Sequence, residues 1–104
     1  MRIPILALLV LAFAAEAEAA QNPTRHGRAL AREFCGKCHA IGLRDRSRHP
    51  GAPPLRTLGQ RLDLDRLPRM LERGISGGHP DMPQVKFSED DARDLRAYLR
   101  SIQR

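Results

Sequence analysis

The sequence predicts a small all-α domain with three main helices joined by irregular loops. At 104 residues, the chain is long enough for one domain at most. Apolar residues recur at helical spacing in three stretches, residues 23–34, 63–74 and 88–103. No stretch shows the alternation of apolar and polar residues that would predict a convincing strand.

Residues 1–19 have the features of a secretory signal peptide. An apolar run covers residues 3–15, and residues 17–19 (Ala-Glu-Ala) offer a cleavage site, with residues 15–17 as a second candidate. The run is too short to span a membrane comfortably. We therefore expect export to the periplasm with a cleaved signal peptide, and an uncleaved signal that anchors the protein to the membrane is the alternative.

The first predicted helix covers residues 23–34, with Thr24 as the expected N-cap. Leu30 and Phe34 lie four residues apart and so share one face. Gly27 lies inside the helix, where glycine costs stability relative to alanine. Its presence is explained if another helix crosses closely at that point.

The end of this helix leads into Cys35-Gly-Lys-Cys38-His39. Cys-x-x-Cys-His is the signature of a covalently attached c-type haem. Each thiol adds to one vinyl group at the porphyrin edge, and the following histidine is carried under the ring, where its imidazole can bind the iron. No other cysteine is present in the chain. We therefore predict one haem c, attached through thioethers to Cys35 and Cys38, with His39 as the proximal ligand.

A Cys-x-x-Cys pair has two other common uses, in redox dithiols and in structural zinc sites. A redox dithiol usually lies near a strand–helix–strand pattern, which is not found here. A structural zinc site needs four ligands, and His26, His49 and His79 match no zinc-finger spacing. A thiol–disulfide oxidoreductase is thus only a remote alternative.

Residues 41–62 show little helical periodicity and include a charged loop at residues 44–48. Leu55 and Leu58 are placed to touch the haem ring from this segment. An arginine of the loop, or Arg61, is a candidate partner for the haem propionates, and the sequence does not distinguish between them.

The second predicted helix falls within residues 63–74. Pro68 is tolerated only near the first turn, which favours a start at Asp65, and Gly74 is a natural stop. One face of this helix is apolar and is expected to pack against the haem or the other helices; it consists of Leu64, Leu67, Met70 and Leu71.

Met82 lies in a stiff polar loop, between Asp81 and Pro83. A methionine in such a loop does not fill a helical core, and it follows His39 by 43 residues, far enough to reach the opposite face of the ring. We predict Met82 as the second axial ligand, whose neutral thioether favours Fe(II) and raises the reduction potential. Pro80 and Pro83 would hold the loop against the iron.

Two other residues compete with Met82 for this position. Met70 lies on the apolar face of a predicted helix and is interpreted as a core residue. His79 would give bis-histidine ligation with a lower potential, but a histidine in such a turn is more often exposed.

The third predicted helix, residues 88–103, has the clearest pattern. Ser88 and Asp91 resemble a capping box, and acidic residues fill the first turn. The hydroxyl of Tyr98 needs a hydrogen-bond partner if it is buried. The predicted buried stripe consists of Ala92, Leu95, Tyr98, Leu99 and Ile102.

The part of the chain after the signal peptide has only three aromatic residues, Phe34, Phe87 and Tyr98, so the haem is expected to form part of the core. The formal charge is +6, and it becomes +7 when residues 1–19, with one arginine and two glutamates, are removed. A basic protein attracts acidic partners, anionic membranes or nucleic acid. Export and the lack of a nucleic-acid motif argue against nucleic acid, which leaves acidic docking surfaces of redox proteins as the expected partners.

The sequence resembles the class I, mono-haem bacterial c-type cytochromes over residues 20–104. The resemblance is carried by Gly27, by the Cys35–His39 motif and by three further segments, Ala52–Leu55, Gly74–Pro83 and Leu95–Ile102. It implies the small cytochrome c fold, in which three main helices and loops wrap around one haem, the N- and C-terminal helices cross at Gly27, and His39 and Met82 bind the iron. One departure is Ala31, where the family commonly has an aromatic residue.

These observations predict an electron carrier, not an enzyme. The iron cycles between Fe(III) and Fe(II) with both axial positions filled, so no small-molecule substrate is expected at the iron. The protein would serve as a soluble carrier or as the haem subunit of a periplasmic oxidoreductase. The alternative is a haem-based sensor or a peroxidase-like protein, in which Met82 dissociates and a gas or peroxide binds.

Overall fold

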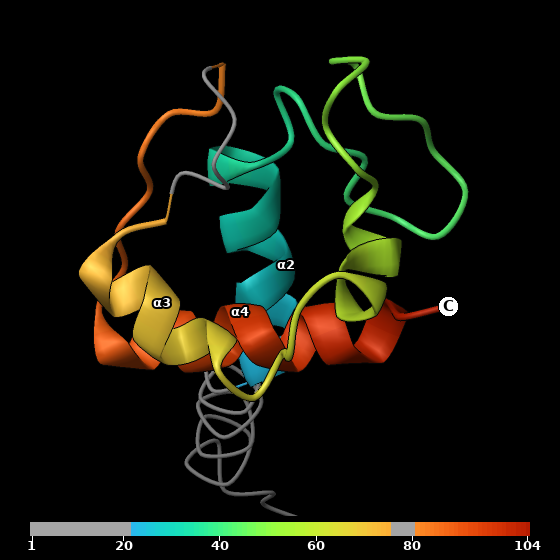
Figure 1. Ribbon diagram of the computed structural model, residues 1–104. Coiled ribbons are helices and arrows are strands. Elements are labelled where there is room, and N and C mark those ends of the chain that lie inside the picture. The colour runs from blue at the N-terminus through green and yellow to red at the C-terminus, as the bar shows by residue number, and fades with distance from the viewer. Residues whose placement is uncertain (1–21, 76–80) are drawn as a thin grey trace, which may run out of the picture.

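The computed structural model describes residues 22–75 and 81–104. Its elements are α2 (Pro23–Phe34), a 3₁₀-helix η1 (Leu55–Gln60), α3 (Leu67–Arg73) and α4 (Glu89–Ile102), as Figure 1 shows. The prediction of an all-α fold with three main helices is confirmed. In these two described segments, the β-pairing is limited to one isolated antiparallel bridge, between Ile75 and Val85.

Three of the sequence predictions concern residues outside the described segments: the signal peptide at residues 1–19, the competing ligand His79, and Pro80. Among the helices that the structure does describe, none is both long enough and apolar enough to cross a bilayer.

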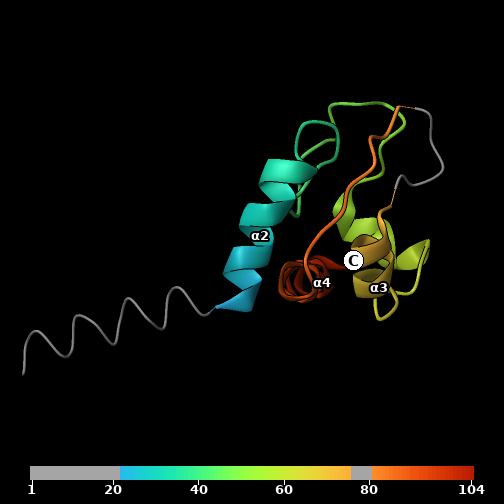
Figure 2. The same cartoon turned by 90° about the vertical axis from the view of Figure 1, so that its left-hand side faces the viewer.

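The fold is organised by the crossing of α2 and α4, which Figures 1 and 2 show from two directions. A Cβ atom added to Gly27 would lie 2.0 Å from the backbone oxygen of Asp94 and 2.8 Å from the Cβ of Tyr98. Only glycine therefore allows this approach, as its position in the sequence predicted. Ala31, one turn further along α2, is fully buried. A small residue at this position, where the family that the sequence resembles commonly has an aromatic one, suits the close contact of the two helices.

α4 has the predicted cap and the predicted buried stripe. The Ser88 hydroxyl accepts a hydrogen bond from the amide of Asp91, which satisfies one of the free donors of the first turn. The Tyr98 hydroxyl finds its partner in the carbonyl oxygen of Ile41, so α4 is tied to the loop that follows the cysteine motif. The stripe residues are all buried, and they are Ala92, Leu95, Tyr98, Leu99 and Ile102.

Three local predictions are wrong. The N-cap of α2 is Asn22, not Thr24; its side chain accepts a hydrogen bond from the amide of Arg25, and Pro23 takes the first helical position, where its missing N–H costs nothing. α3 begins at Leu67, not Asp65, because the Asp63 side chain accepts from the amide of Asp65 and forms a local turn there.

The third concerns residues 41–62, whose little helical periodicity predicted loops alone. The structure has the short η1 in this segment, and Leu55 is its buried residue. Gln103, the C-cap of α4, holds η1 in place: its side-chain oxygen accepts from the amide of Gly59, and its side-chain nitrogen donates to the carbonyl of Leu55. Such a contact between residues 44 positions apart is invisible to helical periodicity.

Candidate functional site

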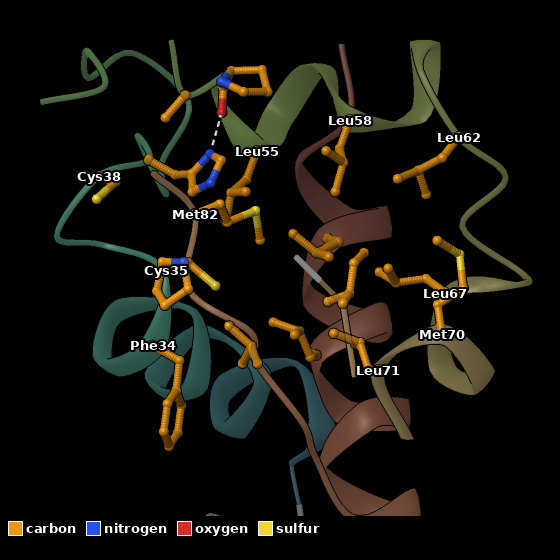
Figure 3. Close-up of a pocket in the computed structure, with 18 of the residues that line it drawn as sticks. Phe34, Cys35, Cys38, Leu55, Leu58, Leu62, Leu67, Met70, Leu71 and Met82 are labelled. Atoms are coloured by element: carbon orange, nitrogen blue, oxygen red, sulfur yellow. Dashed lines mark hydrogen bonds between the residues drawn. The ribbon is translucent and has the colours of Figure 1, made fainter. Parts of the chain in front are cut away.

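A cavity of about 700 Å³ lies between the end of α2, η1, α3 and the loop that precedes α4. This volume is within the range of about 300–1,000 Å³ that is typical of ligand sites. Figure 3 shows Cys35 and Cys38 toward one end of the cavity and Leu62, Leu67 and Met70 toward the other. The wall is largely apolar, and its leucines are Leu55, Leu58, Leu62, Leu67, Leu71, Leu95 and Leu99.

The cysteine motif forms one tight turn directly after α2. Cys35 is the C-cap of the helix, and its carbonyl oxygen accepts hydrogen bonds from the amides of Cys38 and His39, at 3.2 and 2.9 Å. A Cβ atom on Gly36 would lie 2.7 Å from the carbonyl oxygen of Arg32, so a larger residue would strain the turn. The turn brings both thiols and the imidazole to the wall of one cavity.

In the described chain, Cys35 and Cys38 are not joined by a disulfide. Burial raises the pKa of the Cys35 thiol from 9.0 to about 11. Redox-active dithiols have the opposite property, because a lowered pKa supplies the thiolate nucleophile at neutral pH. This environment therefore counts against the thiol–disulfide oxidoreductase that the sequence left as a remote alternative.

The imidazole of His39 has a fixed orientation. Its Nδ1 lies 2.7 Å from the carbonyl oxygen of Pro53, and the dashed line in Figure 3 marks this hydrogen bond. A carbonyl can only accept, so Nδ1 carries the proton and Nε2 keeps a free lone pair. This is the arrangement that a histidine needs to bind a metal through Nε2. The sequence did not identify Pro53 as this partner, because a main-chain carbonyl leaves no signal in side-chain identity.

Met82 also lines the cavity, on the loop between α3 and α4. The bases of this loop are joined by two hydrogen bonds of 2.9 Å between Ile75 and Val85. Next to the methionine, Asp81 Oδ2 lies 3.2 Å from Nε2 of His49, which belongs to the segment that precedes Pro53. The loop is thus tied down on both sides of Met82, and it borders the same cavity as His39.

Two residues differ from their sequence interpretation. Met70 was expected in the core, but it is 38% exposed and lines the cavity. Phe34 was placed on the same face as the buried Leu30, yet it is 48% exposed; it borders the cavity and packs edge-on against Phe87, with ring centroids 5.1 Å apart.

The structure also narrows the choice among the arginines that are candidate partners of the haem propionates. Arg61 lines the cavity, whereas Arg44, Arg46 and Arg48 do not. The neighbour of Arg61 in the sequence, Leu62, lies toward the end of the cavity away from the two cysteines in Figure 3. Leu55 and Leu58, expected to touch the ring, both line the cavity.

The donor set and the shape of the cavity fit a haem c. A porphyrin needs an apolar slot, two thiols at one edge, a histidine with a free Nε2 and a second soft ligand, and each of these is present in the wall of one cavity. In the described parts of the chain, no group of three or more His, Cys, Asp or Glu side chains could hold a bare metal ion.

Comparison with known proteins supports this interpretation. The model of the family described as cytochrome C oxidase, cbb3-type, subunit III matches residues 22–99. Cytochrome c-552 of Bradyrhizobium diazoefficiens is 28% identical over 95 residues, which cover 90% of this chain and 89% of that protein. No solved structure gives a significant match.

Proposed function

This chain belongs to the family described as cytochrome C oxidase, cbb3-type, subunit III, and on that premise we propose that it is a periplasmic electron-transfer protein with His39 and Met82 as its axial ligands. It is a mono-haem c-type cytochrome with covalently bound haem c, and its family supports haem-based electron transfer. The observation that carries the proposed ligation is that both side chains border one cavity, with Nε2 of His39 left free.

In this proposal, Cys35 and Cys38 hold the cofactor through two thioethers, and the turn between them fixes its edge. His39 binds on one face, oriented by the carbonyl of Pro53. Met82 binds on the other face, from a loop that is closed by the Ile75–Val85 bridge. When bound, the haem exchanges one electron between Fe(III) and Fe(II).

The rest of the chain keeps this site dry and neutralises charge. The leucines of η1 and α3 exclude water from the cavity, which limits access of other ligands to the metal. Arg61 is the proposed partner of a haem propionate: propionates leave the porphyrin on the side opposite the vinyl groups, and Arg61 lines the cavity next in sequence to Leu62, which lies away from the two cysteines in Figure 3.

The proposed location and organisation follow from the sequence. Residues 1–19 act as a cleaved signal peptide and residues 20–104 form the cytochrome c domain, because covalent haem attachment in bacteria takes place outside the cytoplasm. The partners are redox proteins with acidic docking surfaces, which the positive charge of the chain would attract. Mass spectrometry of the exported protein tests the cleavage: retention of residues 1–19 would favour a membrane anchor.

The ligation is tested by visible spectra of the exported protein and of Met82→Ala, in both oxidation states. We expect sharp reduced c-type bands that survive denaturation in both proteins. A weak oxidised iron–sulfur band should be present in the wild type and absent in Met82→Ala. Met70→Ala is the matched control, because Met70 also lines the cavity, and it should keep this band.

Loss of the band in Met70→Ala instead would move the ligand to α3, and an unchanged spectrum in both variants would direct attention to His79. Carbon monoxide separates the carrier from the sensor or peroxidase-like alternative. Ready binding to the ferrous wild-type protein would show an exchangeable sixth position, which a carrier with Met82 firmly bound does not offer.

A further inference from the structure

The positive charge of the described chain is unevenly distributed. Residues 22–50 carry seven basic and two acidic side chains, a net charge of +5, whereas residues 51–104 carry ten basic and eight acidic ones, a net charge of +2. The first segment consists of α2, the cysteine motif and the loop after it. These elements lie on the side of the molecule away from α3, as Figures 1 and 2 show.

Four of these cations surround a small surface recess beside the cysteine motif, which we call the basic recess. Its volume is about 370 Å³. Its basic side chains are all exposed, and they are Arg32, Lys37, Arg46 and Arg48. In the described chain, none of the four forms an ion pair, whereas on the opposite side Arg96 and Arg100 each lie 3.4 Å from Oδ1 of Asp65.

The two acidic residues of the recess do not cancel this charge. Asp45 is engaged within its own loop: its carboxylate accepts hydrogen bonds from the amides of Ile41 and Gly42, and it lies 3.8 Å from Nη1 of Arg56, which is not part of the recess. Only Glu33 is left to balance four cations. The recess is therefore a local excess of positive charge, held in a concave shape.

The basic recess also lies directly behind the haem site. Lys37 and His39 line both the recess and the cavity, so that only the turn of the cysteine motif separates the two spaces. A partner that fills the recess is brought within one turn of backbone of the proposed proximal ligand. This proximity is what distinguishes the recess from the other basic regions of the surface.

We propose that the basic recess is the docking site for an acidic redox protein, which inserts carboxylate side chains between Arg32, Lys37 and Arg46. The inference rests on the proposed electron-transfer function and adds the place where the partner binds. A concave recess admits side chains that project from a protein, whereas a flat anionic bilayer would meet only its rim. Complementary charge of this kind raises association rates.

The probe is reduced flavodoxin, an acidic one-electron donor, and the measurement is the second-order rate constant for electron transfer by stopped flow. One electron moves from the reduced flavin of the probe, which is oxidised, to the ferric haem of this chain, which is reduced, and no bond forms or breaks. The test variant is Arg32→Glu/Arg46→Glu. Arg66→Glu/Arg69→Glu is the matched control, because it makes the same change of charge at two exposed arginines of the α3 region.

At low ionic strength, we expect Arg32→Glu/Arg46→Glu to lower the rate constant about tenfold or more, and the control to lower it less than about threefold. The two variants should converge on the wild type at about 1 M salt, where the Debye length is only about 3 Å. Equal losses in both variants would overturn the proposal, since net charge alone would then explain the rates.

A second arm tests the membrane as the occupant. If phosphatidylglycerol vesicles bound the full-length wild-type protein, and only Arg32→Glu/Arg46→Glu abolished this binding while the flavodoxin rate stayed unchanged, the recess would be a lipid site and the proposal would be wrong. The haem spectrum and reduction potential of each variant distinguish a failure of the proposed electron-transfer function from a failure of the docking site. A protein without haem contradicts the proposed function itself, whereas intact haem with unselective rates contradicts only the docking site.

Discussion

At the crossing of α2 and α4, backbone packs directly on backbone, whereas around the haem cavity side chains face an open space. The crossing depends on Gly27, whose added Cβ would lie 2.0 Å from the Asp94 carbonyl oxygen, and on Ala31 and Ala92, which have no exposed surface. The residues of the cavity wall that carry chemistry are only half-buried, among them Cys35, His39 and Met82.

The difference shows which part of the core the chain builds for itself. The polypeptide packs the crossing without help, with helices and small residues. The cavity wall comes mainly from loops, and its apolar residues need a further apolar surface between them. A haem supplies that surface, so the cofactor completes the core as well as carrying the electron. The crossing and the cavity wall should consequently respond differently to perturbation.

The largest effect should come from removal of the haem, by expression without attachment machinery. We expect the remaining free energy of unfolding to be no more than about 3–5 kcal/mol, the most that an unaided core of this size supplies. In hydrogen exchange, the amides of α2 and α4 should keep more protection than those of residues 40–66. Equal protection in the two regions would show that the cavity wall is stable without the cofactor.

The next effect should come from Gly27→Ala in the haem-bound protein. The new Cβ meets backbone that cannot move aside, so the helices must separate, and we expect a loss of about 3 kcal/mol in the free energy of unfolding. Gly59→Ala is the control, since its Cβ would meet the flexible side chain of Gln103 at 2.9 Å. A smaller loss in Gly27→Ala than in Gly59→Ala would contradict the tight crossing.

Tyr98→Phe tests the link between the two regions, because its hydroxyl donates from α4 to the Ile41 carbonyl. Its removal should cost about 1 kcal/mol of unfolding free energy in chemical denaturation. Ser101→Ala removes a hydroxyl that bonds only within α4, to the Tyr98 carbonyl, and should cost less. If the serine change were the more costly one, the link to Ile41 would have no role in joining the regions.

Arg61→Gln should have the smallest effect on stability and act on the reduction potential. Loss of a cation near the cofactor disfavours Fe(II), so the potential should fall by the equivalent of about 0.5–1 kcal/mol, as for a partly exposed ion pair. Arg66→Gln, outside the cavity, should change the potential less. Voltammetry measures both, and a higher potential in Arg61→Gln would show that this arginine does not pair with a propionate.

The sequence was sufficient where a residue acts through a local rule. Ser88 predicted the start of α4, Gly27 predicted a close helix crossing, and the cysteine motif predicted haem c. In each case, residue type and spacing alone meet the requirement for the cap, the crossing or the haem attachment. Met70 shows where such rules stop. Helical periodicity placed it on the apolar face of α3, but only tertiary packing decides that this edge borders a cavity and not the core.

The parts that could not be predicted depend on main-chain groups and long-range contacts. The orientation of His39 comes from a carbonyl at position 53, and η1 is held by a side chain at position 103. Arg61 lies on the cavity wall, whereas Arg46 and Arg48 do not. Their positions could not be predicted because they depend on the path of the loop in space. The axial roles of His39 and Met82 stay predictions, with the shared cavity in their support.

The bridge between Ile75 and Val85 bears on the strength that the bond between iron and Met82 needs to have. A free thioether in solution is a weak ligand, but a ligand on a short closed loop is present at an effective concentration in the millimolar range or above. The contact of Asp81 with His49 fixes the chain at the residue directly before Met82. In the proposed coordination, Met82 thus stays bound because the closed loop keeps its thioether close to the iron. Detachment would require the loop to open as a unit.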